Sequence, residues 1–234
     1  MKLSIIIPVY NEAKTILEVI AKIKSVHLGA DLTREIIIVD DGSTDGTRAI
    51  LKKINDAEFK IFLRDKNEGK GSALIKGFQE ATGDIILIQD ADLEYNPAEY
   101  PKLIEPIIEG RADVVFGSRF MGSEAKRVLF FWHYLGNKML TTFSNIMTNI
   151  NLTDMETCYK VFRREVVDSF KDKLSSKRFG IEPELTARVA HGKWRIYEIG
   201  IAYNGRTYEE GKKINWRDGI AAFWHIIKYN IFIK

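Results

Sequence analysis

Acidic side chains are closely spaced in one short segment of the chain. Asp90 and Asp92 are separated only by Ala91, and Glu94 follows two residues later. Hard oxygen ligands at this density suit Mg²⁺ or Mn²⁺, and such an ion could hold a diphosphate. An isolated Asp-x-Asp can also serve a turn or a helix cap. The elements around this segment therefore decide between the two interpretations.

Three further segments carry polar residues of a similar kind. They are Pro8 to Glu12, Asp40 to Thr47 and Asn67 to Gly71. Capping of a following helix needs only one of the two carboxylates at Asp40 and Asp41, so Asp41 is free to bind the edge of a nucleobase. Tyr10 offers a ring for stacking or for packing, and Glu12 could reach the ribose or the base. Lys70 lies between two glycines and could contact a phosphate, although such a segment also serves a plain turn.

Each of these segments follows a short run of unbroken Ile, Val and Leu residues. Runs without polar alternation favour strands buried on both faces, as in a parallel sheet. We expect strands at residues 3–9, 35–39, 61–63, 84–88 and 112–117. We expect helices at residues 15–26, 47–54 and 72–81 and after Pro97. This order of strands and helices predicts an α/β fold with helices on both faces of the sheet. In such folds ligands bind beyond the carboxyl ends of the strands, which is where these polar segments lie.

Length and composition describe one compact domain. The chain has 234 residues, of which 45% are hydrophobic and 29% charged, which is enough apolar surface for a core. A net charge of +3 does not indicate a nucleic acid partner, and the single Cys158 excludes an intrachain disulfide. Basic residues outnumber acidic ones from Lys160 to Arg178, which indicates either a solvated face or an anionic partner. Lys2 and the short run that ends at Pro8 do not form an export signal, so we expect a cytoplasmic protein.

Residues 119–234 contain two helical patterns with apolar residues at steps of three and four. The first stripe consists of Trp132, Leu135, Met139, Phe143, Ile146 and Ile150, and the second of Ile220, Phe223, Trp224, Ile227 and Ile231. Such stripes belong either to the core or to a surface that docks on a membrane. Aromatic and basic residues near the second stripe favour attachment at a membrane interface. The stretch from Val128 to Leu152 holds too many polar residues for a membrane span.

The segments after the strands resemble the motifs of inverting glycosyltransferases of family 2, which adopt the GT-A nucleotide-binding fold. The matching motifs are Pro8-Val-Tyr-Asn-Glu12, Val39-Asp-Asp-Gly-Ser43 and Asp90-Ala-Asp92. The resemblance implies that residues 1–118 bind a nucleotide diphosphate sugar, with Pro8 and Ala91 in the donor site and Asp41 on the base. It also implies that Asp92 and Glu94 hold the metal ion, with Asp90 as a further ligand. Residues 119–234 would then form the acceptor-binding half of the same domain.

Within that family the chain looks most like polyprenyl- or dolichyl-phosphate hexose synthases. The motifs that carry this resemblance are Gly117-Ser-Arg119, Thr157-Cys-Tyr-Lys-Val-Phe-Arg163 and Gly205-Arg-Thr-Tyr-Glu-Glu-Gly-Lys212. They imply transfer of a hexose from a UDP- or GDP-sugar to a polyprenyl or dolichyl phosphate. The mannose synthases of this group usually carry glutamine where Glu94 stands, so mannose is not implied.

The expected mechanism follows from charge. Negative charge grows on the leaving diphosphate, and the metal ion held by Asp92 together with nearby cations would stabilise it. A lipid phosphate is already ionised and must be held by cations, for which Arg119, Arg206 and Lys212 are candidates. A hydroxyl acceptor would instead need a carboxylate base, and Glu156 is available. A non-catalytic nucleotide-sugar-binding module is a further alternative, whereas the Gly-x-Gly-x-x-Gly of a dehydrogenase is absent.

Overall fold

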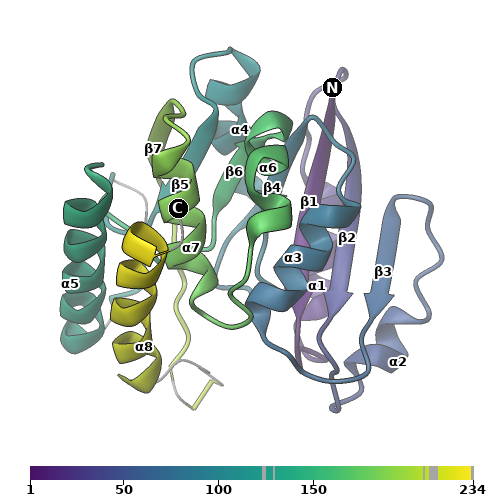
Figure 1. Ribbon diagram of the computed structural model, residues 1–234. Helices are drawn as coiled ribbons and strands as arrows, with labels where there is room; N and C mark the ends of the chain where they lie inside the picture. Colours follow the sequence, from purple (N-terminus) through teal and green to yellow (C-terminus); the bar gives the residue numbers. More distant parts are fainter. Residues whose placement is uncertain (123–124, 129, 208, 211–215, 233–234) are drawn as a thin grey trace.

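A seven-stranded mixed sheet forms the centre of the protein (Figure 1). The computed structural model describes residues 1–122, 125–128, 130–207, 209–210 and 216–232. The strands are β1 (Lys2–Val9), β2 (Thr33–Asp40), β3 (Phe59–Leu63), β4 (Ile85–Ile88), β5 (Val114–Ser118), β6 (Lys160–Arg163) and β7 (Ile196–Gly200). Their order is β3-β2-β1-β4-β6-β5-β7, with β6 antiparallel to its neighbours β4 and β5 and the other pairs parallel. The prediction of a mostly parallel sheet is confirmed.

Helices cover both faces of this sheet, as predicted. They are α1 (Ile16–Ser25), α2 (Thr47–Leu51), α3 (Lys70–Glu80), α4 (Tyr100–Ile108), α5 (Phe131–Thr148), α6 (Arg164–Phe170), α7 (Ile181–His191) and α8 (Trp216–Ile227). Two short 3-10 turns, η1 (Pro97–Glu99) and η2 (Lys171–Lys173), and a π-helical turn, η3 (Lys228–Phe232), complete the list. Figure 1 shows α3 and α6 in front of the sheet and α1 and α4 behind it.

The unbroken apolar sequence of β1 leads to burial on both of its faces. Leu3, Ile5, Ile6 and Ile7 are all fully buried. Helix α3 comes close to this strand because Gly77 has no side chain. A Cβ at that position would lie only 2.3 Å from Cγ2 of Ile6. The five predicted strands are all present, and their ends differ from the prediction by at most two residues.

Strands β6 and β7 and helices α6 and α7 were not predicted. Strand β6 begins with Lys160, a fully buried lysine, so its four residues do not read as an apolar run. Strand β7 lies at the edge of the sheet and is only half-buried along most of its length. Both strands therefore lack the continuous Ile and Val sequence by which the first five were found.

Helices α5 and α8 pack against each other beside the sheet (Figure 1). A small second core lies between them and contains Leu140, Met155, Ala222 and Ile226. Of the predicted stripes, Phe143 and Phe223 pack against this core, with ring centroids 5.4 Å apart. In the part of the chain that the structure describes, no helix is long and apolar enough to cross a membrane.

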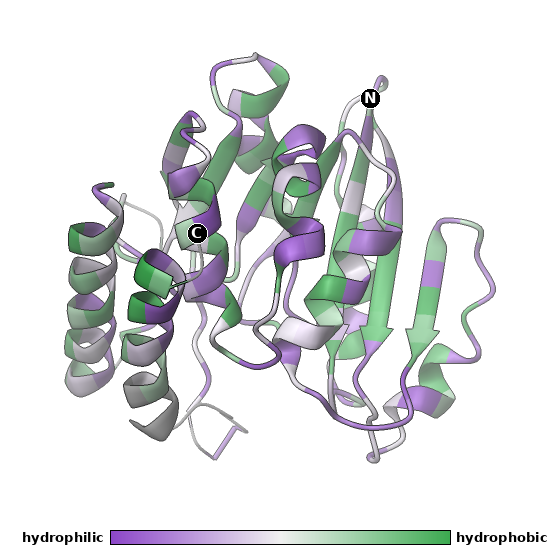
Figure 2. Ribbon diagram, viewed as in Figure 1, coloured by the Kyte–Doolittle hydropathy of each residue, from purple (hydrophilic) through white to green (hydrophobic). Residues whose placement is uncertain are grey.

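The inward face of α5 is partly polar, and much of its apolar stripe faces outward. Thr141 Oγ1 accepts a hydrogen bond from the Met155 amide at 3.2 Å, and the Asn145 side chain makes two hydrogen bonds to the backbone of Leu152. These polar side chains hold the loop that follows the helix, which explains their burial. Trp132, on the predicted stripe, is 75% exposed. Figure 2 shows apolar residues on α5 and α8 as well as in the sheet.

Candidate active site

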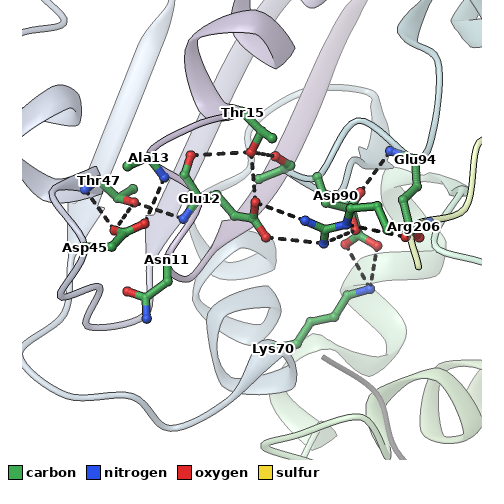
Figure 3. Close-up of polar contacts among 12 residues, drawn as sticks. Asn11, Glu12, Ala13, Thr15, Asp45, Thr47, Lys70, Asp90, Glu94 and Arg206 are labelled. Carbon is green, nitrogen blue, oxygen red and sulfur yellow. Dashed lines mark hydrogen bonds and ion pairs between the residues drawn. The ribbon is translucent and has the colours of Figure 1, made fainter. Parts of the chain in front are cut away.

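Most of the predicted site residues meet at one edge of the sheet, where β1 and β4 end. Figure 3 shows the side chains of Glu12, Lys70, Asp90, Glu94 and Arg206 directed toward one another. Glu12 follows β1, Lys70 begins α3, and Asp90 and Glu94 follow β4. Arg206 comes from the segment after β7 and completes the cluster. The expected convergence at the carboxyl edge is therefore present for these residues.

Asp90 is paired with Lys70. The Lys70 ammonium lies 2.9 Å from Oδ1 and 3.1 Å from Oδ2 of Asp90, and 3.1 Å from Oε1 of Glu182. Gly69 and Gly71, on either side of Lys70, allow the chain to approach the backbone of residues 176–178, since a Cβ at either position would overlap that backbone. The lysine is thus held at the site by two carboxylates.

Asp92 lies among like charges and one cation. Burial, together with the charges of Asp90 and Glu94, raises the pKa of Asp92 to about 7, although the nearby Arg206 opposes the shift. Arg206 Nη2 lies 3.1 Å from Asp92 Oδ2, and the same guanidinium lies 3.5 Å from both carboxylate oxygens of Glu12. Carboxylates gathered in this way repel one another and favour binding of a cation.

Glu94 connects the two halves of the site. Its Oε2 accepts a hydrogen bond from the Tyr203 hydroxyl at 2.7 Å, and its Oε1 accepts one from the Arg206 amide at 2.8 Å. Leu93, the residue before it, has a φ of 64°, a backbone conformation that is uncommon for residues other than glycine. Strained residues of this kind cluster at functional sites. The role of Glu94 as a metal ligand stays a prediction.

The Asp41 carboxylate is buried and holds the loop that leads into α3. It accepts hydrogen bonds from the amides of Glu68 and Gly69, and Arg64 Nη1 lies 3.1 Å from its Oδ1. Gly69, whose amide donates one of these bonds, has a φ of 105°, a conformation that glycine adopts without steric cost. Both oxygens of Asp41 are thus engaged within the protein and are not free, contrary to the expectation from the sequence, and binding of a nucleobase by Asp41 stays a prediction.

The remaining predicted donor-site residues lie along the same edge. Tyr10 is 37% exposed at the end of β1, while Pro8 and Ala91 are buried. The Ala91 carbonyl accepts a hydrogen bond from the Thr15 hydroxyl at 2.7 Å, which joins the segment after β4 to the start of α1. Contact of Pro8, Tyr10 and Ala91 with a donor stays a prediction.

Arg119 is held in a fixed orientation beside the carboxylate cluster. Its guanidinium forms two hydrogen bonds to Asp154, from Nε at 2.6 Å and from Nη2 at 2.7 Å. The guanidinium carbon lies 5.2 Å from the ring centre of Tyr203 and 5.5 Å from that of Phe120. Because Tyr203 also binds Glu94, Arg119 is one residue removed from the predicted metal site.

A buried network of acidic and basic residues lies next to this arginine. Lys160 is fully buried and binds the Glu182 carboxylate and the Thr157 carbonyl. Burial and then the charge of Glu182 raise the pKa of Glu156 to about 7, with Lys160 and Arg119 opposing the shift. Glu156 Oε1 is buried and has no hydrogen-bond partner among the described residues. A carboxyl group with such a pKa can take up a proton near neutral pH.

A model of the family described as Glycosyl transferase family 2 matches residues 4–170 of the chain. The chain belongs to this family. The match includes the segments after β1, β2 and β4 that meet at the site, and it ends before α7, which contributes Glu182.

Two family 2 relatives match most of the chain. Dolichol-phosphate mannosyltransferase of Pyrococcus furiosus is 32% identical over 221 residues, which are 92% of this chain and 61% of that protein. Undecaprenyl-phosphate 4-deoxy-4-formamido-L-arabinose transferase of Proteus mirabilis is 29% identical over 214 residues, which are 90% of this chain and 62% of that protein. The chain therefore spans about three fifths of the length of these relatives.

Solved structures confirm the GT-A fold. Glucosyl-3-phosphoglycerate synthase of Mycobacterium tuberculosis, crystallised with Mn²⁺, UDP and phosphoglyceric acid, superposes with a TM-score of 0.70 at 20% identity. The superposition covers 97% of this chain and 76% of that one. A crystal structure of the same synthase with Mg²⁺ and UDP gives a TM-score of 0.69 at 20% identity, over 98% of this chain and 79% of that one.

Several residues of this candidate site were missed from the sequence. Asp154, Glu182 and Tyr203 each bind a predicted site residue, yet none of them belongs to a spaced motif. Lys160 was counted with the surface cations, but it is buried and does not belong to a basic face. The position of Lys160 between Tyr159 and Val161, within a short apolar run, was the sequence feature that could have indicated its burial. Lys212, predicted to bind phosphate, lies outside the described residues.

Proposed function

We propose that this chain is a metal-dependent inverting glycosyltransferase that moves a hexose from a UDP- or GDP-sugar to a polyprenyl or dolichyl phosphate. The observation that carries the proposal is the cluster of Asp90, Asp92 and Glu94 with Lys70 and Arg206 at the carboxyl edge of the sheet. Paired carboxylates and cations in one place suit a donor that arrives as a diphosphate with a metal ion. Similarity to two polyprenyl-phosphate sugar transferases supports the choice of acceptor.

The residues present fit a bound Mg²⁺ or Mn²⁺. No group of three His, Cys, Asp or Glu side chains within the described ranges is placed to hold a metal ion by itself. Mg²⁺ is usually held by one or two carboxylates and by substrate phosphates, so two of the three predicted ligands, Asp90, Asp92 and Glu94, would satisfy this need. Bound there, the ion would neutralise negative charge on the leaving diphosphate.

The chain's own cations have distinct roles in this proposal. Lys70 and Arg206 lie at the carboxylate cluster and would bind oxygens of the donor diphosphate. Arg119 would hold the acceptor phosphate, and Asp154 with two aromatic rings would keep its guanidinium in a fixed orientation. A phosphate acceptor is ionised at neutral pH and needs no base. These groups bring two anions together and reduce their repulsion.

A lipid acceptor requires access from a membrane, and we propose that α5 and α8 supply it by lying on the cytoplasmic membrane surface. Large apolar side chains on and beside these helices are between 52% and 75% exposed, namely Phe130, Phe131, Trp132, Met139, Ile146, Trp224, Ile231 and Phe232. Exposed apolar residues in such number mark an interaction surface. Flotation with liposomes tests this surface, and we expect a Trp132→Ser, Ile146→Ser variant to float less than the unsubstituted protein. Equal recovery of both proteins in the lower fraction would contradict membrane attachment.

A hydroxyl acceptor is the second candidate, and the Glu156 carboxyl favours it. Its pKa of about 7 is suited to a general base, and it lies beside the Arg119 site. An acceptor with a hydroxyl group, such as a saccharide, would lose its proton to Glu156 during attack on the sugar.

Transfer of labelled sugar distinguishes the two acceptors. Purified protein is incubated with radiolabelled UDP-glucose, UDP-galactose, UDP-GlcNAc or GDP-mannose and a polyprenyl phosphate in detergent, with Mn²⁺ or with EDTA. We expect metal-dependent label in the organic phase from one donor, and loss of that label in Asp92→Asn. Label that stays in water while Mn²⁺ and nucleotide bind would favour the hydroxyl acceptor, and transfer of label to an added saccharide should then occur and should fall in Glu156→Gln. Binding without transfer to either acceptor would instead indicate a non-catalytic module.

A further inference from the structure

Both aspartates of the predicted metal site are paired with basic side chains of the chain itself. Lys70 Nζ lies 2.9 Å from Asp90 Oδ1, and Arg206 Nη2 lies 3.1 Å from Asp92 Oδ2. A carboxylate lone pair that accepts a hydrogen bond from an ammonium or a guanidinium is not available to a metal ion. A divalent ion must therefore compete with two internal cations for these oxygens.

Each of these cations also has a second carboxylate that keeps it at the site. Lys70 lies 3.1 Å from Glu182 Oε1. Arg206 lies 3.5 Å from Glu12 Oε1 and, through Nε, 3.5 Å from Glu94 Oε1. If the aspartates turn to a metal ion, the lysine and the arginine stay within reach of the same space. They are then free to bind another anion there.

Arg206 can change partners by rotating its side chain alone. Its backbone is fixed, because its amide donates to Glu94 Oε1 at 2.8 Å and the Asn204 amide donates to the Glu94 carbonyl at 3.0 Å. The guanidinium is bound less completely, since its buried Nε makes no hydrogen bond in the described part of the chain and has only the Glu94 carboxylate at 3.5 Å as an ion-pair partner. A buried donor without a hydrogen bond requires an explanation. A phosphate oxygen could make the hydrogen bond that this carboxylate does not.

We propose that Arg206 and Lys70 act as internal counter-ions that make binding of the metal ion and binding of the donor diphosphate depend on each other. They neutralise Asp92 and Asp90 until both ligands enter. The aspartates then bind the metal ion, and the two cations bind the phosphate oxygens that arrive with it. By thermodynamic linkage, each ligand raises the affinity of the other by the same factor. This inference rests on the proposed function, because it takes a nucleotide diphosphate as the second ligand.

Direct binding of Mn²⁺ tests the inference without a transfer reaction. The dissociation constant of Mn²⁺ is measured by electron paramagnetic resonance, with and without UDP, for the unsubstituted protein and for Arg206→Met. Methionine keeps an apolar stem of similar length and removes the charge. We expect Mn²⁺ alone to bind the variant about tenfold more tightly, which is the size of one charge-assisted hydrogen bond that no longer competes. We also expect UDP to increase Mn²⁺ affinity less in the variant.

Arg127→Met is the matched control. Arg127 donates to the Gly205 carbonyl at 3.0 Å and pairs with Glu210 at 2.7 Å, so its loss removes one positive charge and one anchor of the same segment. It does not remove a partner of either aspartate, and Mn²⁺ affinity should stay unchanged. Arg206→Lys keeps the charge and should bind Mn²⁺ alone as the unsubstituted protein does.

Two outcomes separate this inference from the proposed function. If Arg206→Met binds Mn²⁺ alone no more tightly than the unsubstituted protein, while Mn²⁺ and UDP still bind, the counter-ion role is wrong and the donor site stands. If the unsubstituted protein binds neither Mn²⁺ nor UDP, the proposed function and this inference both fail. Circular dichroism checks the fold of each variant, and Arg206→Gln provides a second uncharged side chain should the methionine variant not fold.

Discussion

Replacement of Asp154 by asparagine should strongly destabilise the protein. Its carboxylate accepts three hydrogen bonds from Arg119, two from the guanidinium and one from the amide, at 2.6, 2.7 and 3.0 Å. The Asp154 side chain is fully buried, and that of Arg119 is 12% exposed. Removal of one partner of a buried ion pair leaves the other charge uncompensated and costs about 3–5 kcal/mol. For a chain of this size, that loss corresponds to a decrease in Tm of about 6–20 °C.

Urea denaturation followed by circular dichroism measures this loss, and Asp56→Asn is the matched control. The ion pair of Lys24 and Asp56 has the same shortest distance of 2.6 Å, but its side chains are 47% and 32% exposed. Exposed pairs contribute little to stability because water screens them, so we expect the control to unfold close to the unsubstituted protein. Because the two pairs share a distance, the difference between the variants reports burial. Equal unfolding midpoints for Asp154→Asn and Asp56→Asn would refute the reasoning.

Three further predictions concern stability away from the site. Burial alone would raise the pKa of Glu35, but hydrogen bonds from Ser4 and from neighbouring lysines outweigh it and hold that pKa far below the usual 4.5. The stability that this group contributes is present above its unfolded pKa and is lost as pH falls. In urea titrations, the unfolding free energy of Glu35→Gln should therefore vary less with pH below about 5 than that of the unsubstituted protein. The same slope of unfolding free energy against pH in both proteins would contradict this. Gly77→Ala should destabilise the protein by about 1–3 kcal/mol through overlap with Ile6. Gly136 lies in α5, where an added Cβ would meet no other atom of the described residues within 4 Å, so Gly136→Ala should stabilise the protein by about 1 kcal/mol. If both variants shift the Tm in the same direction in thermal melts, packing around the added methyl group does not decide the sign of the change in stability.

The first half of the fold could be predicted because its sequence is locally consistent. Strands such as β1 and β2 contain runs of Ile and Val, which are typical of a parallel sheet covered on both faces. Their polar residues come directly after each strand, so topology alone brings Glu12 and Asp90 to one edge. Here a short-range pattern and a general rule of sheet geometry were sufficient.

The orientation of α5 could not be predicted from periodicity. Its stripe at steps of three and four indicates a helix, but not which side of the helix faces the core. The side that faces inward carries Thr141, Ser144 and Asn145, because Thr141 and Asn145 hold the backbone of the loop after the helix. Hydrogen bonds to a loop that forms only in the folded state therefore determine which side of α5 faces inward. As a result, Trp132 and Ile146 are exposed.

Asp154 and Lys160 were missed for one topological reason, which is the direction of β6. In a parallel sheet the residues after each strand reach the ligand edge, and most of the site residues predicted from the sequence rest on that rule. Strand β6 is antiparallel to β4 and β5, so its amino-terminal end lies at the edge where those strands finish. Residues that precede β6 therefore reach the site, and this is how Asp154 comes to hold Arg119, which follows β5. Lys160, the first residue of β6, binds Glu182 for the same reason, and Glu182 in turn pairs with Lys70 at the start of α3.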